Sequence, residues 1–79
     1  MITELASKEK VIGVKQSSKA IREGRATRVF LAVDADPAIT DPVAAGCAEA
    51  GIPVEAGHTM AQLGQACHIS VGASVVAIL

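Results

Sequence analysis

The sequence predicts an α/β fold: a three-layer α/β/α sandwich whose mixed sheet has about four strands. Apolar, β-branched segments such as 28–33 (RVFLAV) and 75–79 (VVAIL) alternate along the chain with segments that carry helix caps or helical spacing. The 79 residues are 51% hydrophobic and 19% charged, which is typical of a folded chain and not of a disordered one. We expect one domain over residues 1–79.

A helix, a strand and a second helix are predicted first. Thr3 can cap a short helix that runs to about Lys8, and residues 11–14 favour a strand. A helix over 16–23 should end at Gly24, since glycine readily adopts the left-handed conformation that closes helices. Its small residues recur at helical spacing, which predicts a packing face made by Ser17, Ala20, Ile21 and Gly24.

A buried strand and a longer helix follow. The segment 28–33 is apolar after Arg28, as in strands covered on both faces. Residues 34–41 predict a loop, and Asp41 before Pro42 has the pattern of a capping residue followed by proline at the first helical position. That helix should run through residue 50 and end at Gly51.

The last third of the chain predicts a strand over 53–56, a helix, a loop and a final strand. His58 should lie in a loop, and Thr59 and Gln62 have capping-box spacing for a helix to about residue 66. Residues 69–74 form an apolar, glycine-containing loop before the last strand.

Basic residues are concentrated in one part of the chain. Residues 1–28 carry all 7 Lys and Arg and 3 acidic residues, a net charge of +4, whereas residues 29–79 carry 5 acidic residues and no basic ones, a net charge of −5. This division predicts one basic face for a polyanion, although solvated charges also cluster without a partner. Three of the cations recur at helical spacing: Lys15, Lys19 and Arg22. They should therefore lie on one side of the helix predicted over 16–23, with Lys15 just before its start.

Composition excludes several classes of protein. Phe30 is the only aromatic residue, which argues against modules that stack bases on exposed rings. There is no membrane-length apolar run and no charged-then-apolar leader, so we expect a cytoplasmic protein with no membrane partner. Cys47 and Cys67 are too few for a disulfide framework, which fits a reducing compartment.

The strand-to-helix junction at residues 13–20 (GVKQSSKA) combines features that favour nucleic acid. Gly13 allows another backbone to approach closely, and the start of a helix favours phosphate. Lys15 can donate to guanine O6 and N7, and Gln16 can donate and accept at a base edge. Lys19, one turn on, can reach a phosphate or the same base pair. Each feature alone is also typical of an ordinary helix start.

This junction resembles the bacterial form of the signature of the ribosomal protein L7Ae family, which includes L30e and the box C/D snoRNP kink-turn protein. The match in residues 13–20 is Gly-x-Lys-Gln-Ser-x-Lys-Ala, and it continues through 35–37 (Ala-Asp-Pro), 63–67 (Leu-Gly-x-Ala-Cys) and 69–78 (Ile-Ser-Val-Gly-Ala-x-Val-x-Ala-Ile). These motifs occur in the family's order and cover about residues 11–79. The family folds as an α/β/α sandwich and binds kink-turn RNA.

The resemblance implies a role for each matching residue. Lys15, Gln16 and Lys19 would read the tandem G·A pairs beside the kink, while the signature's glycine and serine shape that contact. Asp36 would lie near the base flipped out of the kink, and the loop 69–72 would cover that base with apolar surface. The predicted RNA-binding residues are Gly13, Lys15, Gln16, Ser17, Lys19, Arg22, Asp36, Ile69, Ser70, Val71 and Gly72.

The chain departs from the family pattern at several cations. Archaeal and eukaryotic members carry Asn-Glu where this chain has Lys15-Gln16, and Glu23 replaces a usual basic residue. We therefore expect weak, salt-sensitive binding, with a slope of log K against log salt of about −2 to −4 for ~3–4 phosphate contacts. Family lysines are also absent across Met60, Ala61, Gln62 and Gln65.

We therefore expect a non-enzymatic protein that binds structured RNA, namely a kink-turn in ribosomal or ribosome-associated RNA, with no DNA partner and no cofactor. A protein-interaction module on the same fold is the alternative, and salt dependence separates the two. Asp34 and Asp36 also admit a metal or phosphotransfer site, but phosphotransfer needs a downstream cation and none follows Arg28. The chain also has residues of the types that bind zinc, namely Cys47, His58, Cys67 and His68. Their spacing is not that of a zinc site, so no metal is predicted there.

Overall fold

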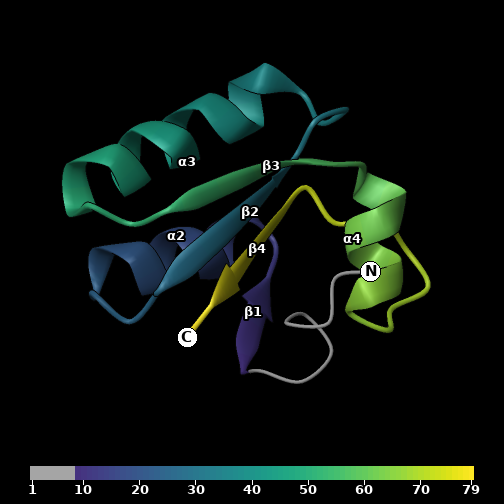
Figure 1. The fold of residues 1–79 in the computed structure, drawn as a ribbon, viewed down its shortest axis with the longest axis horizontal. Coiled ribbons are helices and arrows are strands. Elements are labelled where there is room, and N and C mark those ends of the chain that lie inside the picture. Colours follow the sequence, from purple (N-terminus) through teal and green to yellow (C-terminus); the bar gives the residue numbers. More distant parts are fainter. Residues whose placement is uncertain (1–8) are drawn as a thin grey trace.

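The computed structural model describes residues 9–79, so the helix predicted from Thr3 to about Lys8 lies outside the described residues. Four strands form one mixed sheet in the order β1-β4-β2-β3 (Figure 1). The predicted α/β class and mixed four-stranded sheet are confirmed. The elements are β1 (Lys10–Ile12), α2 (Val14–Arg22), β2 (Arg28–Ala32), α3 (Pro37–Ala50), β3 (Val54–His58), α4 (Met60–Ala66) and β4 (Val75–Ile78).

Helices α2 and α3 cover one face of the sheet, and α4 lies on the other (Figure 1). Side chains alternate between the two faces of β2, so Leu31 packs toward α2 and α3 while Phe30 packs toward α4. All four residues of β4 are buried. The expectation of a strand covered on both faces in the segment 28–33 is confirmed for residues 29–32, whereas Val33 lies beyond β2 and is exposed. Within residues 9–79, no helix combines the length and apolar character needed to cross a bilayer.

Strands β1, β2 and β3 run in one direction and β4 runs in the other. β4 pairs antiparallel with both β1 and β2, and β2 pairs parallel with β3. The carboxyl ends of β1, β2 and β3 therefore meet the amino end of β4 at one edge of the sheet. We call this edge the site end, and the segments 13–16, 33–36, 59–60 and 69–74 gather there.

Helix α3 begins five residues earlier than predicted. Asp36 is its N-cap and accepts a hydrogen bond from the Ala38 amide at 2.9 Å, with Pro37 at the first helical position. Residues 37–41 are therefore helical, and Pro42 lies inside the helix in its second turn. The sequence offers the same Asp-Pro pair twice, and an exposed proline there removes only one helical hydrogen bond. The predicted end at Gly51 is confirmed.

Two other boundaries differ because of glycines. Gly13 has φ 102° and ψ 158°, a conformation that strains other residues, so β1 stops at Ile12 and α2 starts at Val14. Near Gly57 the register between β2 and β3 shifts, from Leu31 opposite Ala56 to Ala32 opposite His58. β3 consequently extends through this bulge. His58 is therefore the last residue of β3 and not a loop residue.

Candidate functional site

The sheet brings the predicted binding segments together at the site end. The Gly13 amide donates to the Val75 carbonyl at 2.8 Å, which fixes the start of α2 beside the start of β4. The Ala32 amide donates to the Ser74 carbonyl at 2.9 Å, so the end of β2 lies against the loop before β4. Three segments that are far apart in sequence thus meet around β4.

The first turn of α2 presents Lys15 and Gln16 to solvent. Both residues are exposed, at the second and third helical positions after the Gly13 cap. The turn contains no acidic residue, and no side chain caps it. The amide groups of a helix start carry partial positive charge when helical carbonyls do not reach them. This corner therefore offers a base-reading amide, an ammonium group and a positive helix end in one place.

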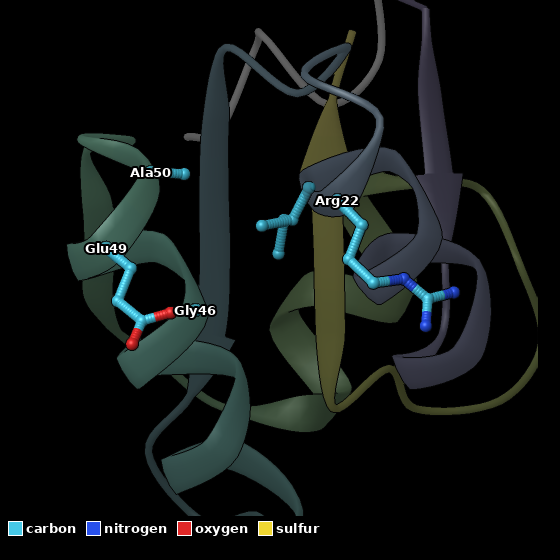
Figure 2. A pocket seen from close by; sticks show the side chains of 5 residues that line it. Arg22, Gly46, Glu49 and Ala50 are labelled. Atoms are coloured by element: carbon cyan, nitrogen blue, oxygen red, sulfur yellow. The ribbon is translucent and has the colours of Figure 1, made fainter.

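Lys19 and Arg22 continue the exposed side of α2. With a rise of 1.5 Å per residue, Arg22 lies about 10 Å along the axis from Lys15. It stands beside an open groove between α2 and α3, and its side chain extends away from Glu49 on α3 (Figure 2). Lys15 therefore lies at the site end and Lys19 one turn further along α2, whereas Arg22 is the last residue of the helix. We call Lys15, Gln16 and Lys19 the Lys15–Lys19 corner.

Ser17 lies on the inner side of α2 and is fully buried. Ala20 and Ile21, the neighbours predicted for the same packing face, are also buried, whereas Gly24 lies in an exposed turn. Within residues 9–79 the Ser17 hydroxyl has no hydrogen-bond partner. Ser17 can consequently influence a ligand only by holding α2 against the sheet.

The end of α4 fixes the loop 69–72. The amides of His68 and Ile69 donate to the carbonyls of Gln65 and Gly64 at 3.1 and 3.0 Å, the two bonds of a Schellman motif. His68 holds the left-handed position, with φ 60°. The loop therefore leaves α4 in a defined direction.

Glycine at position 64 permits the loop to pack directly on α4. A Cβ atom at Gly64 would overlap the carbonyl oxygen of Val71. Ile69 is half-buried and packs on the α4-side core, while the Val71 side chain is 68% exposed. Ser70 and Gly72 are also exposed. The loop is thus anchored from below and presents an apolar tip.

Two of the three aspartates in the predicted loop 34–41 cap helices. Asp36 caps α3, and Asp34 accepts a hydrogen bond from the Met60 amide at the start of α4 at 2.8 Å. The capping box of Thr59 and Gln62 is present as predicted. Among the described residues, no group of three potential ligands could hold a metal ion.

The basic residues do not form the single face that their clustering in the sequence predicted. Lys10 and Arg28 both lie opposite Ile78 in the sheet, at the end away from the site. Arg28 donates to Glu55 at 2.7 Å and stacks over Phe30, 5.5 Å from the ring centre. Lys10 and Arg28 lie far from the site end because each is the first residue of its strand, and β1 and β2 both begin at the opposite end of the sheet. Arg25 pairs with Glu23 at 2.9 Å in the turn after α2.

The two cysteines are free and buried. Burial raises the pKa of the Cys47 thiol in α3. Burial also raises the pKa of Cys67, and the nearby charge of Lys10 opposes part of that increase. Both thiols are therefore protonated at neutral pH and are poor nucleophiles.

The sequence analysis gave neither Gly64 nor Asp34 a role in the RNA-binding site. Gly64 carries the contact with the loop, and Asp34 connects the end of β2 to the start of α4. Gly64 stands within one of the recognised motifs, but the sequence does not show which backbone segment needs the space of the missing side chain. The partner of Asp34 is 26 residues away, too far for any local pattern to reveal.

Known proteins resemble this chain in both sequence and fold. A model of the ribosomal protein L7Ae/L30e/S12e/Gadd45 family matches residues 3–79. The chain is 51% identical to RNA-binding protein YbxF of Geobacillus stearothermophilus and 48% identical to an RNA-binding protein of Geobacillus sp. (strain WCH70). Each match extends over 69 residues, 87% of this chain and 84% of the relative.

Two solved structures superpose closely. The Giardia lamblia 15.5kD RNA binding protein has a TM-score of 0.82 and 31% identity, over 87% of this chain and 58% of its own. A protein of unknown function from Bacillus halodurans has a TM-score of 0.81 and 26% identity, over 87% of this chain and 69% of its own.

Proposed function

Because this chain belongs to the ribosomal protein L7Ae/L30e/S12e/Gadd45 family, we propose that it is a non-enzymatic RNA-binding protein that recognises kink-turn RNA. Relatives about half identical to it are named RNA-binding proteins, which supports RNA as the ligand. One observation carries the proposal: the Lys15–Lys19 corner and the loop 69–72 share the site end, linked by the hydrogen bond from Gly13 to Val75. Its RNA is ribosomal or associated with the ribosome, in the cytoplasm.

The Lys15–Lys19 corner reads the tandem G·A pairs. Lys15 donates to guanine O6 and N7, and the Gln16 amide pairs with the edge of adenine. Gly13 has no side chain to obstruct the approach of the RNA. Lys19 contacts a phosphate one turn further along, with Arg22 able to reach only a more distant phosphate.

The loop 69–72 receives the extruded base. An unstacked base exposes two apolar faces, and Val71 offers one apolar side chain at a fixed position. Ile69 stabilises the loop from beneath, and Ser70 and Gly72 line its exposed side. The carboxylate of Asp36 can accept from a base N–H, since its contact with Ala38 uses one oxygen only.

The protein stabilises the kinked RNA because only that form brings G·A pairs and an extruded base to the two surfaces at once. A ligand shifts a conformational equilibrium only through its difference in affinity for the two states. We therefore expect the affinity for an unkinked RNA to be that of phosphate contacts alone.

A titration of labelled kink-turn RNA tests this function, with the same RNA carrying Watson–Crick pairs in place of G·A as the comparison. Lys15→Ala and Gln16→Ala should weaken binding to the kink-turn more than binding to a plain duplex. Lys10→Ala is the matched control, because it removes the same charge at the far end of the sheet. Equal losses on both RNAs from Lys15→Ala would show that this lysine does not read bases.

A protein-interaction module remains the second candidate, and the uncharged exposed side of α4 favours it. Ala61, Gln62 and Gln65 are exposed there and carry no charge. Absence of binding to either RNA at low salt would favour that candidate, since RNA binding through the Lys15–Lys19 corner requires a salt-sensitive attraction.

A further inference from the structure

The backbone of Met60, the first residue of α4, is held from two sides. Its carbonyl accepts a hydrogen bond from the Ala73 amide at 3.0 Å, and its amide donates to the Asp34 carboxylate at 2.8 Å. Gly72 also packs on it, since a Cβ atom at position 72 would lie 3.1 Å from the Cβ of Met60. Asp34 and the end of the loop 69–72 are therefore connected through a single residue.

The sheet fixes the position of Asp34. The Ala32 amide donates to the Ser74 carbonyl at 2.9 Å. The Val33 amide donates to the His58 carbonyl, also at 2.9 Å. The backbone just before Asp34 is thus held by neighbouring segments on both sides of β2, and the Asp34 side chain reaches from there to the start of α4.

Helix α4 has a complete cap of its own. In its capping box the Gln62 amide donates to Thr59 Oγ1 at 3.1 Å, and the Thr59 amide donates to Gln62 Oε1 at 2.8 Å. The bond from Met60 to Asp34 is additional, and it ties the helix to the end of β2. Because the loop rests on α4 at both Met60 and Gly64, one turn apart, the position of the helix decides the position of the loop.

We propose that Asp34 is a positioning residue for recognition of the extruded base: through Met60 it holds the loop 69–72 where the base is received. The inference rests on the function proposed above and adds to it a residue that favours the base without touching it. Asp34 acts as a hydrogen-bond acceptor. Its negative charge by itself opposes binding, because it repels the phosphates of an RNA.

The size of the effect follows from the fraction of protein whose loop is in place. The apparent Kd equals the intrinsic Kd divided by that fraction. Loss of one hydrogen bond shifts such an equilibrium by about three- to tenfold. We expect Asp34→Ala to raise the Kd by about threefold, the lower end of that range, because part of the shift leaves the loop in place. Asp34→Asn keeps an oxygen that accepts the same N–H, so it should bind at least as tightly as the unsubstituted protein.

A comparison of two RNAs tests the proposal: the kink-turn, and the same kink-turn with an abasic nucleotide at the extruded position. Asp34→Ala should bind the first about threefold more weakly. It should bind the second with unchanged affinity, because that RNA has no base to place. Asp41→Ala is the matched control, since it removes the same charge from an exposed position on α3, and it should not weaken binding to either RNA.

Three results have distinct meanings. An equal loss on both RNAs from Asp34→Ala, or the same loss from Asp34→Asn, would overturn the inference. Equal affinity of the unsubstituted protein for the two RNAs would also overturn it, because the loop would then not contact the base. Equal affinity for the kink-turn and for the Watson–Crick RNA would instead remove the proposed function, and this inference with it.

Hydrogen exchange of backbone amides tests the connection in the protein alone. In Asp34→Ala the Ala73 amide should exchange about three- to tenfold faster, whereas the Gly13 amide, bonded to the Val75 carbonyl, should keep its rate. An unchanged rate at Ala73 would overturn the inference. Equally faster exchange at both amides would show a general loss of stability and would also overturn it.

Discussion

Gly64→Ala should destabilise the protein and displace the loop 69–72, although alanine is the better helix former. Replacement of glycine by alanine inside a helix ordinarily stabilises it by about 1 kcal/mol. At position 64 the new methyl group meets the carbonyl oxygen of Val71, which belongs to the backbone and cannot rotate away. Overpacking of this kind costs about 1–3 kcal/mol. Because rigid backbone is the obstacle, we expect the upper part of that range and a net loss of about 1–2 kcal/mol.

Gly46→Ala is a matched control within the same molecule. Gly46 also lies inside a helix, but a Cβ there would meet only Cγ2 of Ile21, at 3.9 Å, an ordinary contact. This variant should gain the full helix term of about 1 kcal/mol. The two substitutions are chemically identical and are predicted to change stability in opposite directions.

Thermal unfolding followed by far-UV circular dichroism measures both changes, since the chain has no Trp or Tyr. About 1 kcal/mol corresponds to a shift of about 4–8 °C in a domain of this size. Gly46→Ala should therefore raise Tm and Gly64→Ala should lower it, with weaker kink-turn binding for Gly64→Ala alone. A Tm increase of equal size in both variants would refute the reasoning, because it would mean that the loop does not press on α4.

Three further outcomes follow from particular residues. His68→Gly should raise the free energy of unfolding by about 1 kcal/mol, measured by urea titration, because position 68 holds a left-handed φ of 60° that strains a residue with a Cβ atom. Arg28→Ala should lower stability by at most about 1 kcal/mol, since its pair with Glu55 is partly exposed, and should leave the Kd for RNA unchanged. Cys47 and Cys67 should react slowly with thiol reagents until the protein unfolds. Burial raises both pKa values in the folded state, so the unfolded state releases its thiol protons first and stability falls as pH rises above the unfolded pKa. A stability that is constant through that alkaline range would contradict this assignment.

Local chemistry made much of the fold predictable. The capping box at Thr59 and Gln62 and the glycine that ends α3 act within a few residues, so the sequence displays them completely. The segment 28–33, which is apolar after Arg28, predicted a strand buried on both faces, and residues 29–32 of β2 form such a strand. The signature at residues 13–20 predicted a strand-to-helix junction at the position where the structure has one.

Predictions failed where the answer depended on the whole molecule. Two Asp-Pro pairs fit the start of α3 equally well, and only the path of the chain after β2 selects Asp36 over Asp41. The clustering of cations in the sequence did not predict their place in space. In the sheet, Lys10 and Arg28 lie at one end and Lys15 lies at the other, although all three belong to the basic first third of the sequence. Which residues act in binding remains a prediction.

The position of β4 has a consequence for protein synthesis. β4 is the last strand of the sheet to be translated, yet it occupies a central position, between β1 and β2. Until β4 leaves the ribosomal exit tunnel, β1 has no neighbour in the sheet, and no Val75 carbonyl is present to accept the hydrogen bond from the Gly13 amide. A nascent chain therefore cannot assemble the site end before its final strand emerges. A ligand that needs both the start of α2 and the loop before β4 can therefore bind only after residues 75–78 have emerged.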